Sequence, residues 1–195
     1  MAKKNFTGKH ILLLLLYLPG ITKEKNEPIK GRTRIMKMIF LFDKEIRNNF
    51  EKDSDVENIQ LPDFLPWKYG PFSKDVYDDI EFFINNAFII YKTLNEEMSL
   101  AEIDEYENWM EDYSLEDKSE LILNILNEER FSLSDKGVKF VEGEIYNRIS
   151  SNQKEILTNF KARLNEATLS AILRYVYKKY PEFSKESQIQ DRYLY

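Results

Sequence analysis

The chain has 195 residues, 43% of them hydrophobic, so it is long and apolar enough to bury the core of a single domain. It contains no cysteine, one histidine and only 6 glycines, which excludes disulfides, thiolate metal sites, most histidine chemistry and glycine-rich phosphate loops. The net charge is −6, but the charges are unevenly distributed along the chain. Residues 51–130 carry 22 acidic and 6 basic side chains, whereas residues 1–50 carry 4 acidic and 11 basic ones. This asymmetry predicts two faces of opposite charge.

An apolar run, Ile11–Leu18, comes first along the chain and is too short to span a bilayer. Thr7 is a good N-cap and Pro19-Gly20 ends the run, so we expect a buried helix in a cytoplasmic protein without a membrane partner. A secretory signal peptide is the alternative. The lysines ahead of the run favour it, and the absence of a small-x-small cleavage site argues against it.

Two further helices follow in the sequence. The first begins at Thr33, and its apolar residues recur at helical spacing from Ile35 to Phe50. The second begins after Ser73, a favourable N-cap. Its predicted buried stripe consists of Val76, Tyr77, Ile80, Phe83 and Ile84. Between the two helices, residues 67–72 contain a Gly-Pro pair and are predicted to form a turn.

A pair of short strands is predicted after the third helix. Phe88–Leu94 and Arg130–Leu133 are rich in β-branched and aromatic residues, and we expect them to pair as a wing. Between them, residues 95–129 form an acidic insertion that is predicted to contain two short helices. The alternative to an acidic contact face is that this insertion is merely solvated.

The last third of the chain predicts three more helices. Ser134 and Ser150 are the expected N-caps of the first two. An apolar stripe from Leu169 to Tyr180 predicts the last helix, which Pro181 ends.

This order of elements predicts a mainly α fold with a small β wing, namely a winged helix-turn-helix core followed by C-terminal helices. We expect a winged-helix domain over residues 1–137, with the acidic helical insertion at 95–129. A C-terminal helical extension over residues 138–195 is expected to pack on that domain.

The third helix carries the clearest signal for a binding partner. In a winged helix this element normally enters the major groove of DNA. Here it presents Asp75, Asp78 and Asp79 against the single Lys74, so contact with a polyanion would add repulsion. We therefore predict that Asp75, Asp78 and Asp79 contact a protein partner.

Trp67 and Tyr69 belong to the same predicted partner-binding set. Aromatic side chains dominate interface hot spots, so the two rings could serve as a docking surface or as a platform on which a base stacks. The alternative is a structural elbow, in which both rings pack over the start of the third helix.

Basic side chains near the start of the second helix support an alternative, DNA binding. With the one lysine of the third helix, they are Lys30, Arg32, Arg34, Lys37 and Lys74. Such side chains neutralise phosphates, and a homodimer would let two of these patches act together. An ordinary solvated face is a further interpretation.

The sequence offers no constellation for catalysis, so we expect no enzyme, no cofactor and no metal. His10 has no nearby nucleophile, and the acidic insertion lacks the interposed glycine of a calcium loop. Pro62-Asp63 followed by Glu116-x-Lys118 imitates a nuclease pattern, but such matches arise freely in a chain that is 32% charged.

Three stretches of the chain form a recognisable set: GRTRIMKMIFLF at residues 31–42, WKYGPFS at 67–73 and LSDKG at 133–137. Together they resemble the YwgA-type winged-helix proteins. The closing stretch LRYVYKKYPEF at 173–183 is similar to the C-terminal signature of that family, so the resemblance covers nearly the whole chain. The family has no agreed biochemical activity, and the resemblance therefore implies a fold rather than a function.

A second resemblance rests on the WKYGP turn at residues 67–71 and the Val76-Tyr77 pair. It is to the Panacea, or SocA-like, antitoxin domains, which neutralise toxins or act as proteolytic adaptors. The chain departs from their pattern at Phe72-Ser73, where an apolar pair is usual. We expect a non-catalytic recognition module that binds a protein partner in a regulatory, antitoxin-like or defence-associated role. A DNA-binding transcription regulator is the alternative.

Overall fold

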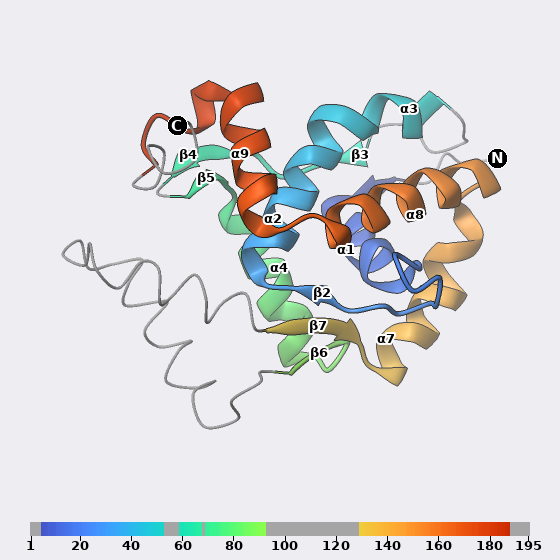
Figure 1. Ribbon diagram of the computed structural model, residues 1–195. Helices are drawn as coiled ribbons and strands as arrows, with labels where there is room; N and C mark the ends of the chain where they lie inside the picture. The colour runs from blue at the N-terminus through green and yellow to red at the C-terminus, as the bar shows by residue number, and fades with distance from the viewer. Residues whose placement is uncertain (1–4, 53–58, 68, 93–128, 188–195) are drawn as a thin grey trace.

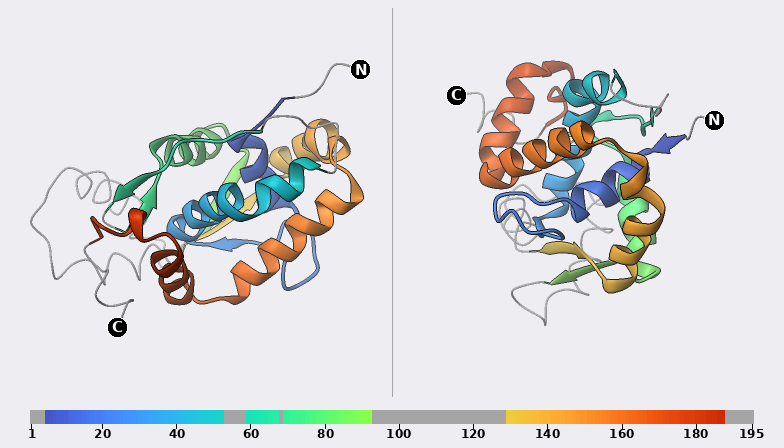
Figure 2. Two further views of the ribbon diagram at one scale, coloured as in Figure 1. Left: turned by 90° about the horizontal axis from the view of Figure 1, so that it is seen from above. Right: turned by 90° about the vertical axis from the view of Figure 1, so that its right-hand side faces the viewer.

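A computed structural model describes residues 5–52, 59–67, 69–92 and 129–187, which form a mainly helical fold with small sheets (Figures 1 and 2). The helix α1 (Gly8–Tyr17) is part of the core, and its side chains are buried from Ile11 to Tyr17. Its N-cap is Thr7, as predicted. The ring of His10 accepts a hydrogen bond from the Thr7 backbone N–H at 3.0 Å, so the single histidine helps to fix the start of this helix.

The second predicted helix consists of three consecutive segments. These are α2 (Arg32–Leu41), a π-helical turn η1 (Phe42–Ile46) and α3 (Arg47–Lys52). Nine of the ten residues of α2 are buried. This helix therefore has no solvated face, and the interpretation of its basic residues as an ordinary solvated face is wrong.

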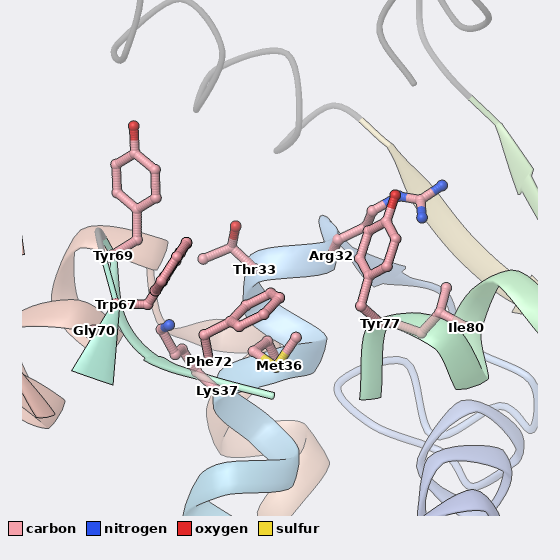
Figure 3. A pocket seen from close by; sticks show the side chains of 10 residues that line it. All are labelled: Arg32, Thr33, Met36, Lys37, Trp67, Tyr69, Gly70, Phe72, Tyr77 and Ile80. Carbon is pink, nitrogen blue, oxygen red and sulfur yellow. The ribbon is translucent and has the colours of Figure 1, made fainter. Parts of the chain in front are cut away.

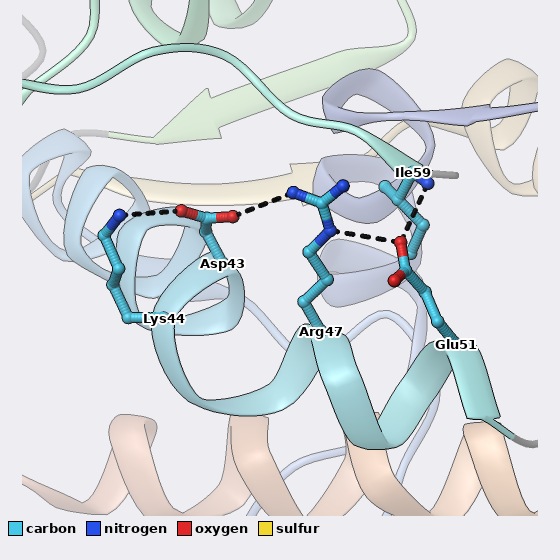
Figure 4. Close-up of polar contacts among 5 residues, drawn as sticks. All are labelled: Asp43, Lys44, Arg47, Glu51 and Ile59. Carbon is cyan, nitrogen blue, oxygen red and sulfur yellow. Dashed lines mark hydrogen bonds and ion pairs between the residues drawn. The ribbon is translucent and has the colours of Figure 1, made fainter. Parts of the chain in front are cut away.

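A chain of polar contacts fixes the end of this long helical segment (Figure 4). Arg47 donates to Asp43 at 3.3 Å and to Glu51 at 3.0 Å. Glu51 also accepts from the backbone N–H of Ile59 at 3.0 Å. The contact anchors β3 (Ile59–Gln60), which pairs in parallel with β1 (Phe6–Thr7).

A three-stranded antiparallel sheet lies beside the helices. Its strands β2 (Ile29–Lys30), β7 (Arg130–Leu133) and β6 (Ile89–Lys92) are arranged in the order β2-β7-β6. The predicted pairing of the last two is confirmed, with Tyr91 opposite Phe131. The sequence does not predict β2, because two residues carry no periodicity.

A hairpin precedes the third helix of the prediction. Residues predicted as irregular chain and a turn form β4 (Leu65–Trp67) and β5 (Gly70–Phe72), which pair antiparallel. The helix α4 (Lys74–Asn85) then begins after Ser73 and buries Val76, Tyr77, Ile80 and Phe83, as predicted.

The C-terminal part of the described chain is helical. It contains α7 (Asp135–Phe140), the turns η2 (Val141–Ile145) and η3 (Tyr146–Arg148), α8 (Ser151–Glu166), α9 (Leu169–Lys179) and η4 (Pro181–Phe183). Both predicted caps are confirmed: Ser134 Oγ accepts from the Gly137 N–H at 3.1 Å, and Ser150 Oγ accepts from the Gln153 N–H at 3.0 Å.

The C-terminal helices pack directly on the N-terminal ones. α8 contacts α1, α9 contacts α2, and Gln153 of α8 donates to the backbone carbonyl of Phe50 at 2.7 Å. The predicted domain boundary after residue 137 lies inside α7. The predicted acidic insertion lies outside the described residues, except for Glu129.

Candidate functional site

A cavity between α2, the β4–β5 hairpin and the start of α4 gathers side chains from both predicted binding sets (Figure 3). Its walls carry four aromatic and two cationic side chains: Trp67, Tyr69, Phe72, Tyr77, Arg32 and Lys37. The cavity volume is about 30 Å³, room for roughly two water molecules. It therefore accommodates a single small group and not a whole cofactor.

Gly70 sets the position of the hairpin in this wall. Its φ is +82°, which disfavours other residues, and an added Cβ would lie 2.6 Å from Cε1 of Tyr177. The hairpin can therefore pack closely on α9. Within the hairpin, the rings of Trp67 and Phe72 have centroids 6.0 Å apart.

Arg32 is 4% exposed and forms two ion pairs, one with the buried Glu129 and one with the half-buried Glu81. Its Nε donates to Glu129 at 3.2 Å, and its Nη1 donates to Glu81. The guanidinium also lies 5.6 Å from the ring centroid of Tyr77. Burial alone would lower the pKa of Arg32, but Glu129 and Glu81 raise it, so the side chain remains charged.

Lys37 is 2% exposed, and its Nζ donates to the backbone carbonyl of Pro71 at 2.8 Å. Burial lowers its pKa to about 7. The amine is therefore partly neutral at physiological pH, and it lies beside aromatic rings. In the described part of the chain, no carboxylate forms an ion pair with it.

The aromatic members of the predicted partner-binding set differ in exposure. Tyr69 is 8% exposed, so the prediction of an exposed docking side chain is wrong there. Trp67 is half-buried, and its indole N–H is shielded from solvent without a hydrogen-bond partner among the described residues. Both residues line the cavity opposite Tyr77 and Ile80 of α4. The contacts of their hairpin are with α2 and α9, so the elbow over the start of the third helix stays a prediction.

The predicted phosphate-binding patch does not form on the surface. Lys30 and Lys74 are exposed, but Arg32, Arg34 and Lys37 are buried inside the protein. The prediction of an exposed patch is wrong for these three, because the helix that carries them packs against α1, α4 and α9. Apart from the Lys30 carbonyl, which accepts from Arg34, their polar partners are distant in the sequence, so no local pattern identifies these residues as buried.

The three predicted aspartates do lie together. Asp75, Asp78 and Asp79 line a second, open groove of about 390 Å³ that Lys9 and Pro62 also border. Asp75 and Asp78 are exposed and form no ion pair with the described residues. Burial and the charges of the other two aspartates raise the pKa of Asp79, although Lys9 opposes them.

Lys9 joins this groove from α1. Its Nζ lies 3.2 Å from Asp79 Oδ1 and 5.3 Å from the ring centroid of Phe82. An ammonium group therefore binds here between a carboxylate and an aromatic face, a pairing that the sequence does not predict. The groove offers two further carboxylates to other cations.

The described residues contain no group of three or more His, Cys, Asp or Glu side chains placed to hold a metal ion. Among them there is also no helix of the length and apolar character that crossing a membrane requires. No model of a known protein family matches this chain, and no curated protein matches it.

Proposed function

We propose that the chain is a non-catalytic winged-helix module that recognises a basic segment of a protein partner. The succession of α1, α2 and α4, followed by the antiparallel pair β6–β7, supports the winged-helix part of this proposal. In such a domain, α4 occupies the position of the helix that reads DNA. A regulatory or antitoxin-like setting rests on the resemblance of residues 67–77 alone.

The unpaired carboxylates of α4 carry the proposal. Asp75 and Asp78 face solvent in one groove and have no cationic partner among the described residues. The neighbouring Asp79 already forms an ion pair with Lys9. A lysine or arginine from a partner could form the same contact with Asp75 or Asp78. The negative charges of these two aspartates would repel a nucleic-acid backbone.

The experiment is equilibrium binding of a fluorescent lysine-rich peptide to the full chain. We expect Asp75→Lys with Asp78→Lys to weaken binding at least about tenfold, because attraction becomes repulsion at both positions. Glu155→Lys is the matched control, since Glu155 is exposed on α8 outside the groove. An equal loss in the control, or no binding by the unaltered chain, would contradict the proposal.

DNA binding is the second candidate. The exposed Lys30 and Lys74 favour it. Its other three predicted phosphate contacts are buried, which reduces its support. Salt-dependent affinity for duplex DNA, lost when Lys30 and Lys74 are changed to glutamate, would establish this function instead.

A further inference from the structure

A third depression lies where β2 and β7 meet the loop after α1 and the C-terminal end of α8. Its volume is about 270 Å³. The charged and amide side chains in its wall are Glu27, Lys30, Arg34, Arg130 and Asn165. Three of them are cationic, and the proposed docking at α4 uses none of them.

Arg34 is the buried cation of this pocket, with an exposed fraction of 6%. Its Nε donates to the backbone carbonyl of Lys30 at 3.2 Å, and its Nη1 donates to the carbonyls of Leu164 and Ala167. Its Nη2 makes no hydrogen bond with the described residues, and no carboxylate among them pairs with it. Charges this deeply buried are normally paired, so the guanidinium lacks its usual counter-charge.

Lys30 and Arg130 bring two more cations to the same place. They are directly opposite each other on β2 and β7, and Lys92 of β6 is opposite Arg130 on its other side. Directly opposed side chains share a face of the sheet with Cβ atoms roughly 5 Å apart, where like charges repel. None of the three forms an ion pair in the described part of the chain. An anion between them would relieve this repulsion.

The one carboxylate of the pocket is already engaged. Glu27 Oε1 accepts from Asn165 at 2.7 Å, and its Oε2 accepts from the N–H and the hydroxyl of Thr22, each at 2.7 Å. Burial alone would raise the pKa of Glu27, but these hydrogen bonds lower it to about 2. The buried Lys161 lies next to this residue, and its Nζ donates to the backbone carbonyl of Glu27 at 2.6 Å. Glu27 forms no ion pair with Lys30, Arg34 or Arg130, and the pocket keeps an excess of positive charge, with three cations against one carboxylate.

We propose that this pocket binds a phosphate group, free or carried by a small molecule, through Lys30, Arg34 and Arg130. Guanidinium groups offer the forked donors that phosphate oxygens accept, and a doubly charged anion cancels the repulsion across the sheet. A concave pocket encloses one such group, which favours a small ligand over a nucleic-acid backbone.

The test is calorimetric titration of the full chain at constant ionic strength, first with inorganic phosphate and then with glycerol phosphate. We expect Lys30→Gln with Arg130→Gln to weaken binding at least about tenfold, because two charge-assisted contacts are lost. Both side chains are exposed, so the fold should tolerate the changes. Lys139→Gln, an exposed lysine on α7, is the control and should bind as the unaltered chain does.

The two titrants separate the two sources of phosphate. Tighter binding of glycerol phosphate supports a carried group, and tighter binding of inorganic phosphate supports a free anion. The proposal would be overturned if neither titrant binds with a dissociation constant below about 10 mM, or if Lys139→Gln loses as much affinity as the double variant. Binding of duplex DNA alone, abolished by the double variant, would overturn it in favour of a nucleic-acid backbone. Because α4 is unaltered throughout, these outcomes are independent of peptide docking.

Discussion

The buried side chain of Lys161 caps the C-terminal end of α1. Its fully buried Nζ donates to the carbonyls of Leu16 at 3.2 Å, Leu18 at 2.7 Å and Glu27 at 2.6 Å. Carbonyls at the end of a helix lack partners within it, and a cation there interacts favourably with the helix dipole. One ammonium therefore joins α1 and the following loop to α8.

Replacing this lysine should destabilise the fold strongly. We expect Lys161→Met to lower the free energy of unfolding by about 3 kcal/mol or more, because buried carbonyl oxygens lose their donor. Urea denaturation measures the effect. Lys178→Met, at an exposed position on α9, should change stability by less than about 0.5 kcal/mol. Similar values for the two variants would contradict the assigned role of Lys161.

Lys37 predicts a pH dependence of stability. Burial lowers its pKa to about 7 in the folded protein, whereas an unfolded chain has a lysine pKa of about 10.4. Between these values the unfolded state binds more protons, so the free energy of unfolding should rise with pH. The contribution of Lys37 is at most about 1.4 kcal/mol per pH unit, and it vanishes below pH 7 as both states become protonated.

Denaturation of Lys37→Met between pH 7 and pH 9 checks this dependence. The rise in stability should be smaller than in the unaltered chain but not absent, because burial also lowers the pKa of Lys161 to about 7. Lys178→Met is again the control and should keep the full rise. A slope in Lys37→Met equal to that of the control would contradict a buried, deprotonating amine.

At the scale of elements, the β4–β5 hairpin depends on one glycine. An added Cβ at Gly70 would meet the ring of Tyr177, whereas at Gly143 nothing lies within 4 Å of it. We expect Gly70→Ala to lower the free energy of unfolding by about 2 kcal/mol, and Gly143→Ala to leave it unchanged or slightly higher. Urea denaturation of both variants makes the comparison. Equal effects would contradict the close packing of the hairpin on α9.

The elements differ in how far the sequence predicts them. Helix starts at Thr7, Ser134 and Ser150 are predicted correctly because capping is a local interaction. The two-residue β2 and the hairpin are missed, because strands this short have no periodic pattern and depend on distant partners.

The candidate site is predicted less completely than the fold. The three aspartates of the groove belong to one helix, so their spacing alone brings them together. The burial of Arg32 depends instead on Glu81 and Glu129, which are 49 and 97 residues away in the sequence. A basic residue with such distant partners has the same local pattern as one on a solvated face.

The molecule as a whole carries two surfaces of opposite charge. The groove on α4 presents unpaired carboxylates, and the pocket beside β2 presents unpaired cations. The two lie on different elements, so the proposed docking of a basic segment and the proposed binding of an anion would not compete for one surface. We propose that the exposed face of α4 repels nucleic acid and attracts basic polypeptide.

Duplex DNA binding can be measured by fluorescence anisotropy near physiological salt. We expect the unaltered chain to bind random duplex more weakly than about 100 µM, the weak end of non-specific DNA binding. Asp75→Lys with Asp78→Lys should bind it more tightly, because the repulsion is reversed. If the unaltered chain binds at about 10 µM or tighter and the double variant shows no gain, the α4 carboxylates do not repel nucleic acid.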